Sequence, residues 1–176
     1  MSVLIVFESM YGNTEAIARG IADGLAGHTA VNIAEVGTTP TAIPDDVELL
    51  VVGGPTHALG MTRESTRQDA AQRTSEALVS RDIGVREWLA ALPKPSRQIP
   101  ATAFDTRTAK PRIPGSAARA AGRRLRDLGF DRISPQSFFV EGVTGPLIDG
   151  ETERARQWGE RLAHQLADGD RRPRMV

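Results

Sequence analysis

The sequence of 176 residues contains no cysteine. This absence excludes disulfide bonds, iron–sulfur clusters and zinc sites built on thiolates. The sequence also has no apolar run of the length that spans a membrane, so we expect no membrane insertion. Because the first strand pattern begins next to Met1, it leaves no room for a signal peptide, and we expect a cytoplasmic protein.

The formal net charge is zero, since 22 basic residues balance 22 acidic ones. A neutral chain has no general electrostatic attraction to nucleic acid, so we expect no nucleic-acid partner. Metal-ligating residues do not recur at a recognisable spacing, and no nucleophile has a base at a suitable distance along the chain. The sequence therefore predicts neither a metal site nor a catalytic residue.

Two uninterrupted aliphatic segments, residues 3–7 and 49–52, are the strongest structural signal. Strands of this kind are buried on both faces, which indicates a parallel sheet covered by helices on both sides. Further strands are expected at residues 30–36, 101–104 and 132–140. Pro135 interrupts the last of these and favours a place at the sheet edge.

Helical patterns separate these strands. They are expected at residues 14–25, at residues 68–79, after an N-cap at Asp82, after Ser116, and in a closing segment around Trp158. Both Trp88 and Trp158 fall on core-facing positions, so packing explains them. The alternation of strand and helix is typical of a doubly wound α/β sheet in one domain, residues 1–168, followed by a flexible tail, 169–176.

The turn after the first strand contains a concentration of hydroxyl groups, from Ser9, Tyr11 and Thr14. It leads directly into a helix, whose first N–H groups and dipole favour an anion such as phosphate. The turn contains no Lys or Arg, which argues against a Walker-type nucleotide site. An anion loop therefore follows the first strand.

The order of these residues resembles the flavodoxin family. Residues 9–14, Ser-Met-Tyr-Gly-Asn-Thr, resemble the flavodoxin phosphate loop, and residues 52–57 resemble the start of the second flavin loop. Residues 104–107 lie where a third loop follows the fourth strand, and residues 145–159 resemble the region of the last helix. The resemblance implies a flavodoxin-like fold, a three-layer doubly wound α/β structure with a five-stranded parallel sheet in the order 2-1-3-4-5.

The resemblance also implies non-covalently bound FMN. Its phosphate is expected to bind to the hydroxyl groups of Ser9 and Thr14 and to the backbone N–H groups of residues 10–14. Its ring is expected between residues 55–61 and residues 105–110. The residues implied in cofactor binding are Ser9, Met10, Tyr11, Gly12, Asn13, Thr14, Pro55, Thr56, His57, Ala58, Leu59, Gly60, Asp105, Thr106 and Arg107.

Several roles within these loops stay open. His57 is either a solvated loop residue or a flavin contact, with proton donation as a further alternative. Asp105 and Arg107 form a surface ion pair or lie on either side of the ring edge. Gly60 is the residue of its loop expected to reach a positive φ, where flavodoxins rearrange a peptide on reduction.

Three functions are compatible with this sequence. An FMN-binding protein that transfers electrons to or from a redox partner protein is expected first. Carrier flavodoxins, however, are usually acidic and hold the ring between aromatic residues, whereas this chain is neutral and carries Arg63 and Arg107 in its flavin loops. The alternatives are an FMN-dependent oxidoreductase that acts on a quinone or a porphyrinogen, and a flavodoxin-fold interaction module without flavin.

Overall fold

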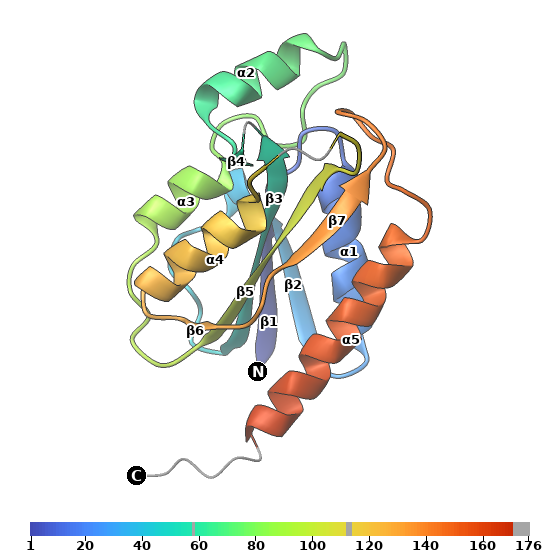
Figure 1. The fold of residues 1–176 in the computed structure, drawn as a ribbon. Coiled ribbons are helices and arrows are strands. Elements are labelled where there is room, and N and C mark those ends of the chain that lie inside the picture. Colours follow the sequence, from blue (N-terminus) through green and yellow to red (C-terminus); the bar gives the residue numbers. More distant parts are fainter. Residues whose placement is uncertain (58, 112–113, 171–176) are drawn as a thin grey trace.

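The computed structural model describes residues 1–57, 59–111 and 114–170. Its central sheet contains β1 (Ser2–Phe7), β2 (Ala30–Glu35), β3 (Val47–His57) and β5 (Pro100–Thr108). The fifth position is shared by β6 (Asp131–Arg132) and β7 (Gln136–Val140), both of which pair with β5. The order across the sheet is β2, β1, β3, β5 and then β6 with β7, and all these pairings are parallel (Figure 1). The expected flavodoxin-like order is confirmed.

The burial of the strands follows their apolar content. All six residues of β1 are buried, as are nearly all residues of β3 up to Pro55. Pro135 separates β6 from β7, since proline has no N–H to donate to the sheet. The hydroxyl group of Thr102 on β5 donates to the carbonyl oxygen of Ser134 across this break, at 3.1 Å. The expected edge position of the interrupted strand is therefore confirmed.

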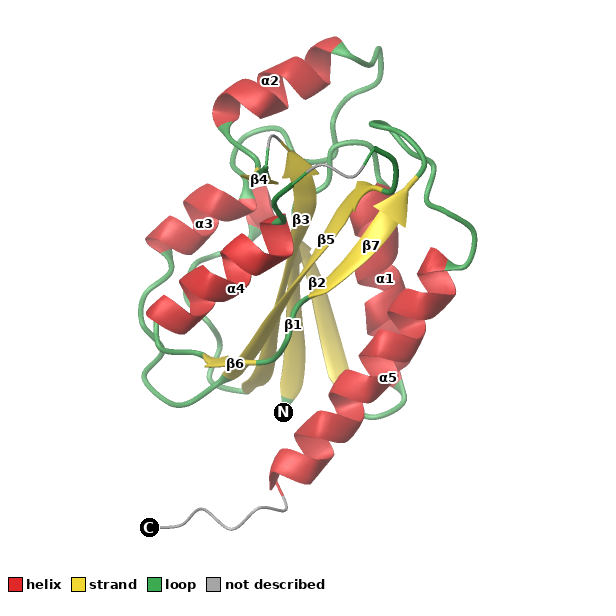
Figure 2. Cartoon of the chain, in the orientation of Figure 1, coloured by secondary structure: helices red, strands yellow, loops and turns green. Residues whose placement is uncertain are grey.

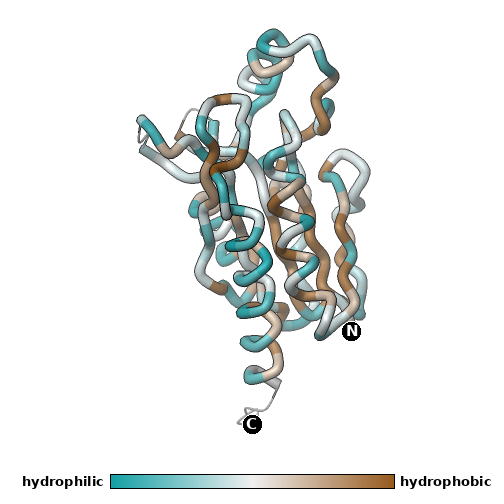
Figure 3. Tube along the Cα trace, turned by 90° about the vertical axis from the view of Figure 1, so that its right-hand side faces the viewer, coloured by the Kyte–Doolittle hydropathy of each residue, from teal (hydrophilic) through white to brown (hydrophobic). Residues whose placement is uncertain are grey.

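Helices cover both faces of the sheet (Figure 2). On one face lie α1 (Asn13–Ala26) and α5 (Glu151–Asp170), and on the other lie α3 (Val85–Ala91) and α4 (Ala117–Asp127). Each face has its own hydrophobic core, with Trp88 in one and Trp158 in the other. In Figure 3 the hydrophobic colour runs along the strands between helices with hydrophilic outer positions. Both tryptophans have the predicted packing role.

The segment between β3 and α3 differs from the prediction. β3 turns back into the short antiparallel strand β4 (Gly60–Met61), which is followed by α2 (Glu64–Gln72) rather than by a helix at residues 68–79. Residues 73–84 then cross back over the sheet end without helical structure. The predicted N-cap at Asp82 is wrong, because α3 begins at Val85 and Gly84 is its N-cap. The Glu87 carboxylate accepts from the N–H of Gly84 at 2.9 Å.

Two other boundaries also differ. β5 continues to Thr108, so residues 105–107 belong to a strand rather than to a loop. α5 extends to Asp170, and the remaining predicted tail, residues 171–176, lies outside the described residues. Among the residues that the structure describes, none of the helices combines the length and hydrophobicity needed to cross a membrane.

Candidate functional site

A hollow of about 180 Å³ lies at the carboxyl ends of four strands, β1, β3, β5 and β7. This is the position where ligands bind in open α/β sheets, beside the point at which the strand order reverses. Its lining residues are Ser9, Met10, Tyr11, Asn13, Thr14, Pro55, Thr56, His57, Thr106, Arg107, Thr108, Val140 and Val143. The fold thus brings together the three segments that the sequence analysis singled out.

The side chain of Ser9 organises the loop before α1. Its oxygen accepts from the N–H groups of Gly12, at 3.1 Å, and Glu15, at 3.4 Å. Gly12 has a φ of +89°, which glycine adopts without strain, and it is the N-cap of α1. Since a hydroxyl oxygen has two lone pairs and one hydrogen, the Ser9 hydrogen is left to donate to a ligand.

Thr14 and Thr106 share one hydrogen bond, with 2.8 Å between their hydroxyl oxygens. Both side chains are nearly fully buried, and both line the hollow. One hydroxyl donates to the other, so the pair retains a single hydrogen for a further acceptor. The predicted phosphate contact of Thr14 therefore depends on a partner, Thr106, in a neighbouring strand.

Backbone N–H groups complete a set of donors at the start of α1. In the described part of the chain, no hydrogen bond accounts for the N–H groups of Met10, Tyr11, Asn13 and Thr14. The N-terminus of α1 adds partial positive charge at the same place. Four N–H groups and two hydroxyl hydrogens form a site suited to an anion with several oxygens, such as phosphate.

The charged groups around the hollow agree with an anionic ligand. Arg107 is among its lining residues, and none of the described lining residues is Asp or Glu. Burial lowers the pKa of His57 below its usual value of 6.5, and the nearby positive charge of Arg73 lowers it further. His57 is therefore a neutral ring at neutral pH, able to donate or accept one hydrogen bond.

Residues 70–80 hold the anion loop from outside. The Tyr11 hydroxyl group donates to the carbonyl oxygen of Ala70 at 3.1 Å. Ser80 and Ser9 exchange two hydrogen bonds: the N–H of Ser80 donates to the carbonyl oxygen of Ser9, at 2.8 Å, and the N–H of Ser9 donates to the Ser80 hydroxyl group, at 3.0 Å. The sequence predicted a helix at residues 68–79 but no role in the site, because these contacts join residues that lie about 60 to 70 positions apart in the chain.

A buried polar network anchors the same segment to the end of β1. The Glu8 carboxylate is only 1% exposed and accepts from the Thr62 hydroxyl group and from the N–H of Val85, the latter at 2.8 Å. Arg67 of α2 donates to Thr62 and, through both terminal nitrogens, to Glu87, each at 3.2 Å. Burial raises the pKa of Glu8, and hydrogen bonds from Thr62 and Val85 oppose that rise.

Some predicted site residues have other roles. Asp105 is fully buried, and its Oδ2 accepts from the hydroxyl groups of Thr56, at 2.7 Å, and Ser116, at 2.6 Å, and from the N–H of Ala118, at 3.1 Å. Its carboxylate thus stabilises the N-terminus of α4. The alternative of a surface ion pair with Arg107 is wrong for this side chain, because Asp105 is buried, and Asp105 is not among the residues that line the hollow.

The loop between β3 and β4 also differs from the prediction. Among the described residues of this loop, Leu59 has a positive φ, +79°, whereas Gly60 pairs with His57 in the hairpin. Neither Leu59 nor Gly60 lines the hollow, and Arg63 lies outside it at the N-cap of α2. Ala58 lies outside the described residues.

Two lining residues, Val140 and Val143, lie outside the predicted loops, whereas Thr108 falls within residues 105–110, where the ring was expected. Thr108 and Val140 are the last residues of β5 and β7. Val143 follows β7 and is 58% exposed. Asn13 connects that loop to α1, because its side-chain amide donates to the carbonyl oxygen of Thr144 at 3.0 Å.

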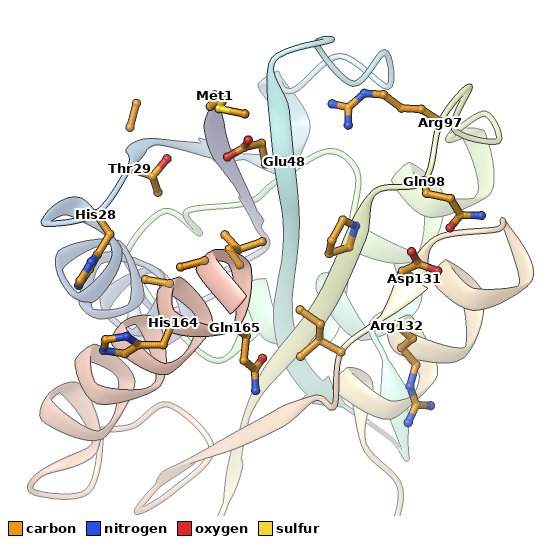
Figure 4. Close-up of a pocket in the computed structure, with 16 residues that line it drawn as sticks. Met1, His28, Thr29, Glu48, Arg97, Gln98, Asp131, Arg132, His164 and Gln165 are labelled. Carbon is orange, nitrogen blue, oxygen red and sulfur yellow. The ribbon is translucent and has the colours of Figure 1, made fainter. Parts of the chain in front are cut away.

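A larger hollow of about 1240 Å³ lies at the opposite end of the sheet (Figure 4). Glu48 and Asp131 contribute negative charge to its lining, and Arg97 and Arg132 contribute positive charge. In the described ranges, no group of three or more His, Asp or Glu side chains is placed to hold a metal ion. Charges of both signs line the larger hollow, whereas several hydrogen-bond donors converge before α1 at the smaller one. The smaller hollow is therefore the better candidate for a ligand site.

Comparisons with known proteins agree with this geometry. The flavodoxin family model matches residues 5–87. A search among curated protein sequences found no match. Solved structures similar to the chain include a flavodoxin from the domain Archaea, with a TM-score of 0.64, 16% identity, and coverage of 95% of this chain and 99% of that one.

Two bacterial structures show the same likeness. The flavodoxin of Streptococcus pneumoniae TIGR4 has a TM-score of 0.63 and 19% identity, over 94% of this chain and 99% of that chain. Two-electron reduced Megasphaera elsdenii flavodoxin has a TM-score of 0.59 and 22% identity, over 93% and 99%. At these identities the likeness concerns the fold. The chain therefore has a flavodoxin-like fold, and its residues 5–87 match the flavodoxin family model.

Proposed function

We propose that the chain binds FMN in the smaller hollow without a covalent bond and exchanges electrons with a redox partner protein. The observation that carries the proposal is the donor set before α1: the N–H groups of residues 10, 11, 13 and 14 and the hydroxyl hydrogens of Ser9 and the Thr14–Thr106 pair. These donors fit one terminal phosphate. FMN supplies the electron-transfer chemistry when bound, and the protein supplies position and electrostatics.

The other lining residues fit the rest of the cofactor. Residues 55–57 at the end of β3 and residues 106–108 at the end of the neighbouring strand β5 also line the hollow, and the flavin ring would extend along them from the phosphate. Arg107 supplies positive charge near the ring, and the neutral His57 supplies one hydrogen-bonding group. These residues bind and orient, and none of them is required to form a covalent bond.

An absorption spectrum of the purified protein tests the proposal. We expect a flavin band, release of the chromophore on denaturation, and its identification as FMN. Replacing Ser9 by Ala and Thr14 by Val removes two charge-assisted hydrogen bonds of about 1.5–3 kcal/mol each, so the affinity for FMN should fall at least about a hundredfold. Ser65→Ala, which removes an exposed hydroxyl group on α2, is the matched control. Undiminished FMN affinity in the double variant would contradict the phosphate assignment.

One observation favours a second candidate, an FMN-dependent oxidoreductase. Tyr11 is the single aromatic residue among the described lining residues, apart from the His57 ring, and its hydroxyl group is directed to Ala70. A ring held without an aromatic residue on each face leaves room for a small acceptor to stack. Steady turnover of NAD(P)H or a quinone without an added reductase would support this second function, and its absence would support the carrier.

A further inference from the structure

The outer face of α4 carries a row of arginines. The exposed residues Arg119, Arg123, Arg124 and Arg126 belong to this helix, and Asp127 is its one acidic residue. The buried residues of the helix, by contrast, are alanine, glycine and leucine. Four arginines against one aspartate give α4 a net charge of +3, in a chain whose formal net charge is zero. Positive charge is therefore concentrated on one exposed helix face.

This arginine row is largely unneutralised within the described part of the chain. Of its four members, Arg126 alone forms an ion pair there, with its neighbour Asp127 at 3.3 Å, and both of these side chains are more than half exposed. Exposed pairs of this kind contribute little. On the opposite face of the sheet, Arg19 of α1 pairs with Glu15, and two arginines of α5 pair with carboxylates three or four residues away.

Helix stability does not account for the row. Arg119 and Arg123 are four residues apart, and Arg123 and Arg126 are three apart, so like charges repel each other along one helix face. Arg119 also lies in the first turn, just after the N-cap Ser116, where the helix dipole disfavours positive charge and no acidic residue compensates. The row therefore destabilises α4 in the free protein, and carboxylates of a binding partner would relieve the repulsion.

The row begins beside the candidate site. The N–H of Ala117 donates to the Thr56 hydroxyl group at 2.9 Å, and Thr56 lines the smaller hollow. Figure 1 shows α4 with its N-terminal end toward the carboxyl ends of β3 and β5. From Arg119 to Arg126 the helix rises about 10 Å, so the whole row lies close to that end. A protein bound to the row would thus lie next to a flavin in the hollow.

We propose that the arginine row of α4 docks an acidic surface of the redox partner protein. The inference rests on the proposed function, since it assigns the surface chemistry of the partner that exchanges electrons with the bound flavin. A guanidinium group binds a carboxylate through two parallel hydrogen bonds, which fixes the orientation of the partner as well as its position.

Other anionic partners fit the row less well. The exposed positions of α4 are arginines and Asp127, so they include no aromatic residue to stack on nucleic-acid bases and no large apolar residue to enter a lipid surface. Asp127 also places a negative charge at the end of the row, which opposes a continuous polyanion. A short cluster of carboxylates on a protein surface matches both the length and the chemistry of the row.

Electron transfer to proteins of opposite charge tests the inference. The FMN-loaded protein is reduced with one equivalent of dithionite under nitrogen and mixed with an acidic blue-copper protein or with a basic cytochrome c. Two acceptor molecules oxidise one reduced protein, because FMN gives up two electrons, each metal centre takes one, and the protons pass to the buffer. Calorimetric titration with the oxidised acidic protein measures docking independently of the flavin.

The matched variants each lose two exposed arginines. Arg119→Gln/Arg123→Gln removes them from the row, and Arg19→Gln/Arg161→Gln removes them from α1 and α5 on the other face of the sheet. Circular dichroism confirms that both variants are folded. Benzoquinone, an uncharged acceptor, should oxidise all three reduced proteins at the same rate, which shows that the flavin site is intact.

In Arg119→Gln/Arg123→Gln, we expect the rate constant with the acidic acceptor to fall about tenfold at low ionic strength, and its dissociation constant to rise about tenfold. Added salt should slow the wild type and reduce this difference. The rate with cytochrome c should not fall in this variant, and Arg19→Gln/Arg161→Gln should behave as the wild type with the acidic acceptor.

An unchanged rate and dissociation constant in Arg119→Gln/Arg123→Gln would overturn the inference. It would also be overturned if this variant lost self-association or binding of single-stranded DNA but still bound the acidic protein, because the row would then serve another partner. Failure of the wild type to bind FMN is a separate result. It would refute the proposed function, whereas the calorimetry would still decide whether the row docks an acidic protein.

Discussion

Leu59 is the one described residue other than glycine with a positive φ, at +79°. In this left-handed region the Cβ atom of an L-residue approaches its own backbone, at a cost of about 1–2 kcal/mol. Burial of the side chain offsets little of this free-energy cost, because Leu59 is 61% exposed. Such strained residues concentrate beside functional sites, and this one follows the end of β3, which lines the candidate site.

Replacing Leu59 by Gly should therefore raise the free energy of unfolding, by about 0.5–1 kcal/mol after allowing for the greater flexibility of glycine in the unfolded chain. Urea denaturation monitored by circular dichroism measures the change. Leu59→Ala is the matched control, since it removes the same exposed side chain and keeps the strain. Equal stability of the two variants would mean that the backbone conformation costs nothing.

Single residues also show what the sequence could predict of the site. The loop of Ser9 to Thr14 was found because hydroxyl groups gather before a helix, and ten of the fifteen predicted residues line the hollow. Asp105 could not be assigned, because its partners lie far from it in the sequence, Thr56 at the end of β3 and Ser116 and Ala118 at the start of α4.

At the scale of elements, α1 and α5 pack closely through glycines. A Cβ atom added to Gly159 would lie 2.2 Å from the carbonyl oxygen of Ile21, and one added to Gly24 would lie 2.0 Å from that of Arg156. Both neighbours are backbone atoms, which cannot turn away as a side chain can. A methyl group at either position would therefore force the two helices apart.

Gly159→Ala should lower the free energy of unfolding by about 1–3 kcal/mol, despite the higher helix propensity of alanine. Gly27→Ala is a suitable control, because no atom lies within 4 Å of its added Cβ and its φ is −70°. Thermal unfolding of both variants measures the difference. A Gly159→Ala protein as stable as the Gly27→Ala protein would show that the helices can separate at no cost.

Periodicity predicted most of the elements. Continuous apolar residues located β1 and β3, and the spacing of core positions located α1 and the Trp158 helix, α5. The exception was α2, which buries few apolar residues and is held by Arg67 and its partners. A helix stabilised by ionic groups that lie far away in the sequence needs no local hydrophobic pattern, so its bounds could not be predicted from the sequence.

At the scale of the whole molecule, Glu8 couples protonation to stability. Its carboxylate is buried against Thr62, Val85 and Arg67, with Glu87 nearby, and burial raises its pKa above the usual value of 4.5. Between these two values the folded protein holds a proton that the unfolded chain has lost. The stabilisation from this proton is complete below pH 4.5 and disappears as the pH rises through the higher, folded pKa.

Glu8→Gln should remove this dependence. The free energy of unfolding of the wild type, minus that of Glu8→Gln, should therefore fall as the pH rises above about 4.5, by about 1.4 kcal/mol for each unit by which the pKa is raised. Urea denaturation over a series of pH values measures it. Glu76→Gln, in an exposed position, controls for the loss of one carboxylate. A difference that does not change with pH would contradict the prediction.

The ends of the described chain have a practical consequence. Met1 and Ala167, near the end of α5, both line the larger hollow, at the end of the sheet opposite the candidate site. An affinity tag, a surface anchor or a second domain fused at the N-terminus would project away from the entrance that a flavin would use. The protein could therefore be immobilised on an electrode through this end while its opposite face stays open to a diffusing redox partner.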